Sequence, residues 1–194
     1  RLYPHLEVIV LNDTGIYDAM NQAIDYVRSP HVLFLNVRDL FVPGSLPLLL
    51  HLLDLSDIDA AYKFLPLVLG RIHYERASLM FFSRHMLNHQ TIVYATNYFR
   101  DCKFNSSCRV VADLRHCLES GLHKNISYID LPLIEYDMSN NFALQSRSIR
   151  SNWLERVQAF GWSIPLDYKI VLTFVAILGT IHVICLRRFR FLWA

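Results

Sequence analysis

The strongest constraint on the fold is the stretch DTGIYDAMNQAIDYVRSPHVLFLNVRD, residues 13–39, in which a polar turn leads into a helix-like pattern and then an apolar run. Apolar side chains recur at the spacing of one helix face, which predicts a helix of about three turns. These side chains are Ile16, Ala19, Met20, Ala23, Ile24 and Val27. Asp13 and Thr14 precede this helix, where a side-chain oxygen can accept from the N–H groups of a first turn. Ser29 comes before Pro30, and a residue before proline disfavours helical geometry, so the helix should end there.

Two apolar runs flank this helix and predict buried strands. LEVIVLN (6–12) precedes it, and HVLFLNV (31–37) follows it with the length and composition of a strand buried on both faces. Strand, helix and strand would then form a parallel crossover unit. Asp13 follows the first run and Asp39 the second, and ligands of open α/β sheets collect at the carboxyl ends of strands. We therefore expect both acids at one edge of the sheet; alternatively, both are solvated loop residues.

The rest of the first 145 residues continues a mixed α/β pattern. An apolar helix is expected at 45–55 after Pro43-Gly44, one or two strands at 59–69, a helix at 110–121 closed by Gly121, and a late strand at 125–134. A chain of 194 residues can hold one such domain with a sizeable core plus a small appendage. The sequence therefore predicts an α/β fold with a mostly parallel sheet flanked by helices.

Composition excludes some classes of function. The 19 basic and 17 acidic residues nearly balance, so the chain lacks the charge of a nucleic-acid-binding protein. Its four cysteines show neither CxxC nor metal-ligand spacing, which favours free thiols in a reducing compartment. The chain opens on Arg1 and enters almost directly into a predicted strand, so we expect that part of the natural protein precedes it.

The C-terminal part differs in kind. Residues 170–186 carry no formal charge and, as a helix, would reach about 25 Å, just under the roughly 30 Å hydrocarbon core. Arg187, Arg188, Arg190 and Trp193 follow as interfacial anchors. We expect a hydrophobic membrane helix within 165–194; alternatives are a buried core helix or a hairpin in one leaflet. Residues 146–164 predict a basic amphipathic helix that lies on anionic lipid or packs on the domain formed by residues 1–145.

Four stretches together resemble a known family. They are DTGIYDAMNQAI, FLNVRD, NHQTIVY and VVADLRHCL, and their order and rough spacing are those of the family 2 glycosyltransferases. The resemblance is closest to the bacterial branch that builds colanic acid, capsule and O-antigen sugars, and it covers roughly residues 6–142. The family's opening strand, with its nucleobase-holding acid, is not in this chain. The resemblance implies a GT-A fold and transfer of a sugar from a nucleotide diphosphate donor, usually with inversion.

The resemblance also implies roles for individual residues. Asp39 would be the last acid of the motif that binds a divalent cation (Mg²⁺ or Mn²⁺), with Asn36 in that motif's first position, and Asp113 would be the general base. The donor would be lined by Asp13, Tyr17, Asp18 and Asn21, and by the His89–Gln90 pair. Each residue also has a structural interpretation. Asp113 would be a helix N-terminal acid, Asp39 a turn residue, His89 a packed histidine and Asn21 a solvent-facing residue.

Two departures from the family pattern bear on the site. Arg38 stands where Gly or Asp is usual, and its charge would either oppose a bound cation or pair directly with the diphosphate, making the cation dispensable. Residues 137–142, DMSNNF, replace the family's Gly-Gly-x-Ser turn near the acceptor.

Three hypotheses of function follow. The first is an inverting transferase on the cytoplasmic side of the inner (plasma) membrane, which acts on a saccharide or lipid-linked acceptor in surface-polysaccharide synthesis and contacts membrane lipid. The second is a degenerate or truncated GT-A domain that serves as a non-catalytic binding or assembly subunit at the membrane. The third is a small membrane-anchored domain unrelated to sugars.

Overall fold

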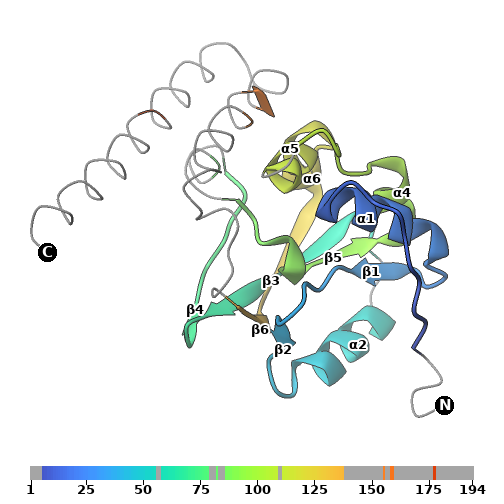
Figure 1. Cartoon of the computed structure of the whole chain (residues 1–194). Coiled ribbons are helices and arrows are strands. Elements are labelled where there is room, and N and C mark those ends of the chain that lie inside the picture. The colour runs from blue at the N-terminus through green and yellow to red at the C-terminus, as the bar shows by residue number, and fades with distance from the viewer. Residues whose placement is uncertain are drawn as a thin grey trace, which may run out of the picture.

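The computed structural model describes residues 6–55, 58–78, 82, 86–108, 111–137, 155, 158–159 and 177. Helices and strands are interspersed along these residues (Figure 1). In chain order they are α1 (Ile16–Ala23), η1 (Ile24–Tyr26), β1 (His31–Leu33), β2 (Leu40–Phe41), α2 (Ser45–Leu55), β3 (Ala61–Val68), β4 (Arg71–Ile72), η2 (His89–Thr91), β5 (Ile92–Ala95), α4 (Thr96–Asp101), α5 (Ala112–Glu119), α6 (Leu122–Asn125) and β6 (Ile126–Tyr136). The predicted α/β class is confirmed.

The described strands form one sheet in the order β1-β5-β3-β6-β2, and β4 pairs with β3 off this path. Among these strands β3–β6 is the parallel pair, whereas β1–β5, β3–β5, β3–β4 and β2–β6 are antiparallel. The prediction of a mostly parallel sheet is therefore wrong. The apolar run 59–69 reports the burial of β3, a central strand, and such burial occurs in either strand direction.

The predicted N-terminal crossover unit is also wrong. Residues 6–12 form no strand, and Val8 and Val10 are 82% and 92% exposed. The predicted strand at 31–37 is reduced to β1, after which Val37 is 92% exposed. Among the described strands β1 pairs with β5 alone. Because residues 6–12 form no strand beside β1, Asp13 is not placed at the sheet edge beside Asp39.

The predicted first helix forms as α1, continued by η1. Its buried face differs from the predicted one at the first turn, where Tyr17 is buried (8% exposed) and Ile16 is exposed (47%). The Asp18 carboxylate accepts hydrogen bonds from both the backbone N–H and the hydroxyl of Thr14. The Asp13 carboxylate accepts from the backbone N–H of Gly15, so it closes the turn before the helix rather than capping its first turn.

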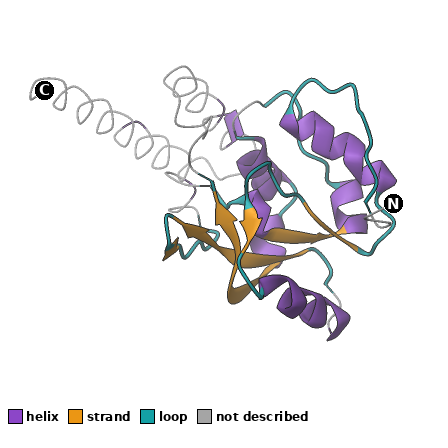
Figure 2. Cartoon of the chain, turned by 60° about the horizontal axis from the view of Figure 1, so that its bottom comes forward, coloured by secondary structure: helices purple, strands orange, loops and turns teal. Residues whose placement is uncertain are grey.

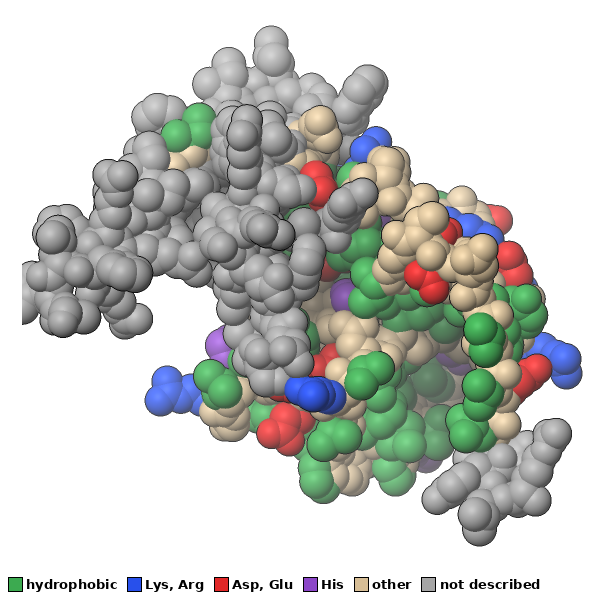
Figure 3. Space-filling model, viewed as in Figure 1, with side chains coloured by type: hydrophobic (Ala, Val, Ile, Leu, Met, Phe, Trp, Pro, Cys, Tyr) green, Lys and Arg blue, Asp and Glu red, His purple; other side chains and the backbone are tan. Residues whose placement is uncertain are grey.

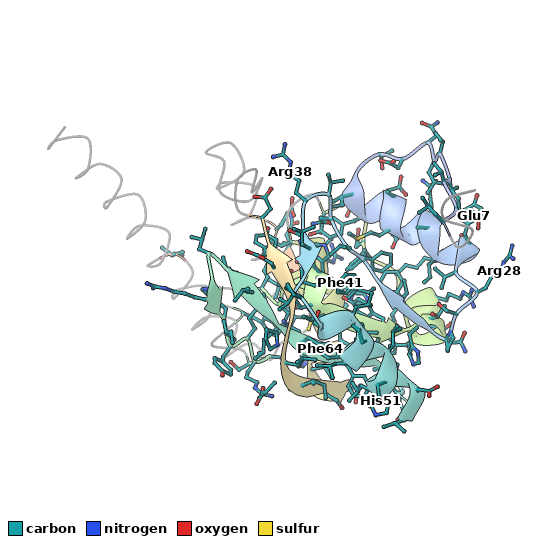
Figure 4. All side chains as sticks on the ribbon, turned by 90° about the horizontal axis from the view of Figure 1, so that it is seen from below. Glu7, Arg28, Arg38, Phe41, His51 and Phe64 are labelled. Atoms are coloured by element: carbon teal, nitrogen blue, oxygen red, sulfur yellow. The ribbon has the colours of Figure 1, made fainter. Side chains whose placement is uncertain are left out.

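Helices cover the two faces of the sheet unequally. Helices α1, α4, α5 and α6 lie on one face and α2 on the other (Figures 1 and 2). The larger core lies under the first group, and a smaller one joins Leu49 of α2 to Phe64 and Leu133 of the sheet (Figure 4). Helix α2 leaves many leucines uncovered, and hydrophobic side chains gather over it in Figure 3.

The other predicted elements form close to their expected places. Helix α2 begins at Ser45 and ends at Leu55 as predicted, and β3, α5 and β6 lie within or across the predicted ranges. Gly121 follows the end of α5 with φ 71°, the left-handed geometry that a helix-ending glycine supplies. The three described cysteines, Cys102, Cys108 and Cys117, are free thiols, as predicted.

The predicted basic helix at 146–164 and membrane helix at 165–194 lie outside the described residues, apart from residues 155, 158–159 and 177. Ala159 is fully buried in the larger core, and the Glu155 carboxylate accepts from the backbone N–H of Val111. These two contacts agree with a segment that packs on the domain. Within the described part of the chain, no helix has both the length and the apolar character needed to cross a bilayer.

Candidate active site

Asp39 closes a tight turn between β1 and β2. Its backbone N–H donates to the Asn36 carbonyl (3.2 Å), and Arg38 between them adopts φ 77°. That left-handed geometry is strained for a residue with a Cβ and natural for glycine. Because β2 pairs with β6, Asp39 lies beside the end of β6, where its Oδ1 accepts from the backbone N–H of Asp137 (2.9 Å). The turn is thus fixed to the end of a strand 98 residues further along the chain.

The Asp39 carboxylate is buried and incompletely paired. The residue is 5% exposed, and within the described structure its Oδ2 has no hydrogen-bond partner of normal length and angle. Burial raises the pKa of Asp39, and the backbone of Asp137, the Gln90 side chain and the charge of His89 oppose that rise. A buried carboxylate oxygen without a partner is costly unless a ligand, such as a cation or a hydroxyl group, completes it.

His89 and Gln90 occupy the short turn η2, which precedes β5. Both side chains are buried, and the Asn88 side chain accepts from the Gln90 backbone N–H to hold the turn. The His89 Nδ1 lies 3.8 Å from Oδ2 of Asp113, and its Nε2 is buried without a hydrogen-bond partner among the described residues. The histidine therefore lies beside the Asp113 carboxylate, and its charge also lowers the pKa of Asp39.

Asp113 lies in the first turn of α5, with its side chain about 10% exposed. Its Oδ1 accepts from the backbone N–H of Leu114, and the helix N-terminus favours its negative charge. Tyr17 of α1 packs against His89 with ring centroids 6.3 Å apart. Burial and the Asp113 charge raise the pKa of Tyr17, and a hydrogen bond with the Asp113 backbone opposes the rise. Tyr17, Asp39, His89, Gln90 and Asp113 therefore form one group, called the central cluster below.

Four of the predicted donor-binding residues lie apart from these contacts. Asp13 is exposed and Asp18 is partly exposed, and both bind their own turn. The Asn21 amide donates to the Phe104 carbonyl (2.7 Å) and accepts from its N–H (2.9 Å), so it ties α1 to the chain after α4. Asn36 contacts the Asp39 turn through its backbone carbonyl, which accepts from the Asp39 N–H. Their predicted roles in donor binding stay predictions.

Arg38 projects from the ribbon beside the Asp39 turn (Figure 4). Its guanidinium is 3.9 Å from the Asp137 carboxylate, and its side chain is 62% exposed. A pair this long and this exposed holds the side chain weakly. Arg38 is thus placed at the rim of the Asp39 turn with most of its surface open to a ligand.

Two residues that the sequence reasoning missed contact the central cluster. Asp137 donates its backbone N–H to Asp39, and burial together with the charges of Asp39 and Asp113 raises the pKa of Tyr136. Asp137 follows an apolar strand, which is the same signal that singled out Asp39. Applied to the strand at 125–134, that signal would have found it.

Asp39 suits a divalent cation as one ligand among several. No group of three His, Cys, Asp or Glu side chains among the described residues is placed to hold a metal by itself. Magnesium is usually bound through one or two carboxylates, with phosphates and water as the other ligands. The free Oδ2 of Asp39 fits that arrangement, in which a diphosphate completes the site.

Comparison with solved structures identifies the fold. The chain superposes on S. aureus TarS 1–349 with a TM-score of 0.55 and 13% identity, over 88% of this chain and 52% of that one. Against the same TarS fragment in complex with UDP-GlcNAc, the TM-score is 0.56 with 14% identity, over 85% and 52%. The α/β architecture with a curled sheet is thus a glycosyltransferase fold of the GT-A type, as the resemblance implied.

The chain spans about half the length of these TarS structures. No protein-family model and no curated protein matches its sequence. The likeness therefore concerns the fold, and the assignment to family 2 and its bacterial branch stays a prediction.

Proposed function

We propose that this chain is all or part of an inverting glycosyltransferase that takes its sugar from a nucleotide diphosphate donor. The observation that carries the proposal is the buried Asp39 carboxylate, whose Oδ2 has no hydrogen-bond partner within the described structure. A second carboxylate, Asp113, faces the same histidine from α5. The GT-A fold supports this class of reaction, and the TarS structure with UDP-GlcNAc supports a nucleotide-sugar as donor.

In this proposal the two carboxylates have different tasks. Asp113 accepts the proton of the acceptor hydroxyl as that oxygen forms its bond to the sugar C1, and the bond from C1 to the diphosphate oxygen breaks with its electron pair on the diphosphate. Asp39 lies on the leaving-group side. A divalent cation bound there would supply neutralisation of the diphosphate charge. His89 lies beside the Asp113 carboxylate, with its Nδ1 3.8 Å from Oδ2.

The finer features belong to the same proposal. We infer a saccharide or lipid-linked acceptor, membrane lipid as a partner through residues 146–194, and a position on the cytoplasmic side of the inner membrane. The membrane contact rests on the uncharged run at 170–186 and the arginines after it, whereas the acceptor and the cytoplasmic side rest on the family resemblance.

A second candidate function is a GT-A domain that binds without catalysis. The strained, positively charged Arg38 next to Asp39 favours it, because a cation there would meet like charge. Both candidates predict nucleotide binding, and they differ in whether a sugar is transferred or hydrolysed.

The test is calorimetric titration of the purified chain with UDP and GDP, with and without Mn²⁺, followed by release of nucleotide from the matching donor sugars. We expect Mn²⁺-dependent binding that is lost in Asp39→Asn and unchanged in the matched control Asp54→Asn, which changes an exposed acid of α2 on the opposite sheet face. Binding without Mn²⁺ that disappears in Arg38→Ala would make Arg38 the diphosphate ligand. Absence of binding to a folded sample would refute the donor site in this chain.

A further inference from the structure

Lys63 is a charged residue in the middle of the sheet that the proposed reaction does not use. It lies on β3, its side chain has no exposed surface, and its Nζ is 2.8 Å from Oε2 of Glu75. Nζ also donates to the Phe64 carbonyl (2.7 Å) and to the Thr91 hydroxyl (2.5 Å). Every direction of the ammonium is thereby occupied, which is the condition under which a buried charge is tolerated.

Stability alone does not account for such a pair. Removing two charges from water costs about as much as their attraction returns, and apolar replacements of similar volume are often neutral or stabilising. Burial lowers the pKa of Lys63, and the charge and hydrogen bond of Glu75 oppose that fall. The role of the pair therefore depends on the contacts that it makes with the rest of the chain.

Those contacts converge on η2. The Lys63 ammonium binds the Thr91 side chain, at the last residue of η2, and Glu75 Oε2 accepts from the backbone N–H of Asn88, the residue before η2 (2.9 Å). The Thr91 hydroxyl also donates to the Asn88 carbonyl (2.8 Å). The ion pair thus holds both ends of the turn that carries His89 and Gln90 between them.

Glu75 itself is held by a segment with independent anchors. The backbone N–H of Ala77 donates to the Tyr128 hydroxyl (2.6 Å), and the neighbouring Arg76 pairs with Asp130 on β6 (2.9 Å). The Arg76 guanidinium also lies over the Tyr128 ring. Loss of the Lys63–Glu75 contact would therefore release η2 while the Glu75 segment stays on the sheet.

We propose that Lys63 and Glu75 are positioning residues that set where η2 presents His89 and Gln90 to Asp113 and Asp39. The catalytic consequence rests on the proposed function, whereas the placement of His89 does not. The pair acts at a distance from any substrate, through the hydrogen bonds at Asn88 and Thr91. When a catalytic side chain is displaced by about 1 Å from its productive position, the reaction rate falls on the order of 100-fold.

The test uses a matched pair at the contact point. Thr91→Val removes the hydroxyl that Lys63 binds with little change of shape, and Thr91→Ser keeps it. Glu75→Gln removes the charge opposite Lys63, and Asp25→Asn is its control, since it breaks an exposed ion pair with Lys103 in which neither residue belongs to η2 or to the Glu75 segment. The readout is the imidazole spectrum of full-length protein labelled with ¹⁵N-histidine, in which His89→Gln assigns the His89 signals.

We expect Thr91→Val and Glu75→Gln to shift the His89 signals, and Thr91→Ser and Asp25→Asn to leave them in place. Where a sugar is turned over, the first two variants should lose on the order of 100-fold in kcat with a smaller change in KM for the donor. Unmoved His89 signals in folded Thr91→Val and Glu75→Gln would overturn the proposal. If single variants do not fold, the neutral double variant Lys63→Met/Glu75→Gln decides it by the same signals. Failure of the proposed function would appear as absent turnover in the unaltered chain, with the spectral result still decisive.

Discussion

His89 Nδ1 lies 3.8 Å from Asp113 Oδ2, and this separation joins the turn before β5 to the first turn of α5. Both side chains are about nine-tenths buried, so the contact is shielded from bulk water. It places a proton-accepting carboxylate against an imidazole whose other nitrogen has no partner in the described structure. The consequences of this arrangement can be tested residue by residue.

Asp113→Asn should abolish transfer and preserve the fold. The amide oxygen can still accept from the Leu114 N–H, whereas the group can no longer accept a proton. Loss of a general base lowers turnover by about 10²- to 10⁴-fold. The measurement is donor turnover beside calorimetric donor affinity, and we expect the affinity to change little. Equal turnover in Asp113→Asn and the Asp54→Asn control would exclude Asp113 as the base.

Arg38→Gly should stabilise the protein. Arg38 holds φ 77°, and relief of that strain outweighs the extra chain entropy of glycine, for a net gain of about 1 kcal/mol in the free energy of unfolding. Loss of the exposed 3.9 Å contact to Asp137 lowers the free energy of unfolding only slightly. Urea denaturation measures the change. Leu69→Gly, at the other described non-glycine residue with positive φ, should give a similar gain. A loss of stability in Arg38→Gly would show that the side chain, rather than the backbone, dominates.

Asn21→Ala should destabilise the fold by about 2 kcal/mol, because it leaves both the N–H and the C=O of buried Phe104 without their partner. The matched control is Gln22→Ala, which removes the exposed hydrogen bonds of this side chain to the Asn12 carbonyl and the Asp18 carboxylate. Denaturant midpoints of the two variants provide the comparison. If both variants behave alike, Asn21 does not hold α1 to the chain after α4.

Acid should unfold this protein partly through His116. Burial lowers its pKa to about 4 from an ordinary 6.5, so the folded state keeps the ring neutral while the unfolded state takes up a proton first. The contribution is fully present above pH 6.5 and declines as pH falls, costing about 3 kcal/mol by pH 4. The slope of unfolding free energy between pH 6.5 and 4 should flatten in His116→Gln. His51→Gln, at an exposed position of α2 (Figure 4), should leave the slope unchanged.

Sequence reasoning succeeded where local signals decide the structure. Helix α2 begins at Ser45 and ends at Leu55 as expected, because Pro43-Gly44 punctuates the chain before an unbroken apolar run. The left-handed Gly121 likewise ends α5. The directions of the strands and the exposure of Val8 and Val10 depend on distant partners, and no local pattern contains that information.

The same division holds for the site. The resemblance picked out Asp39, His89, Gln90 and Asp113, which the fold brings together, although their roles stay predictions. It also picked out Asn21, whose amide is occupied by the Phe104 backbone. Lys63 was passed over because a lysine inside an apolar run looks like a strand-edge charge until Glu75 and Thr91 fold against it.

The hydrogen bond from the Asp137 N–H to Asp39 also governs when the molecule can finish folding. It joins residues 98 positions apart, and β3 likewise waits for β6, with Ala61 paired to Ile126. Contacts of such long sequence separation form late and slow folding, because the entropy cost of closing the loop comes before the contact can stabilise the chain. On the ribosome, the Asp39 turn therefore lacks its hydrogen bond to Asp137 until the segment through Asp137 has emerged. Shorter nascent chains will leave the strand edge that pairs with β6 exposed, where chaperones or other nascent chains can bind it.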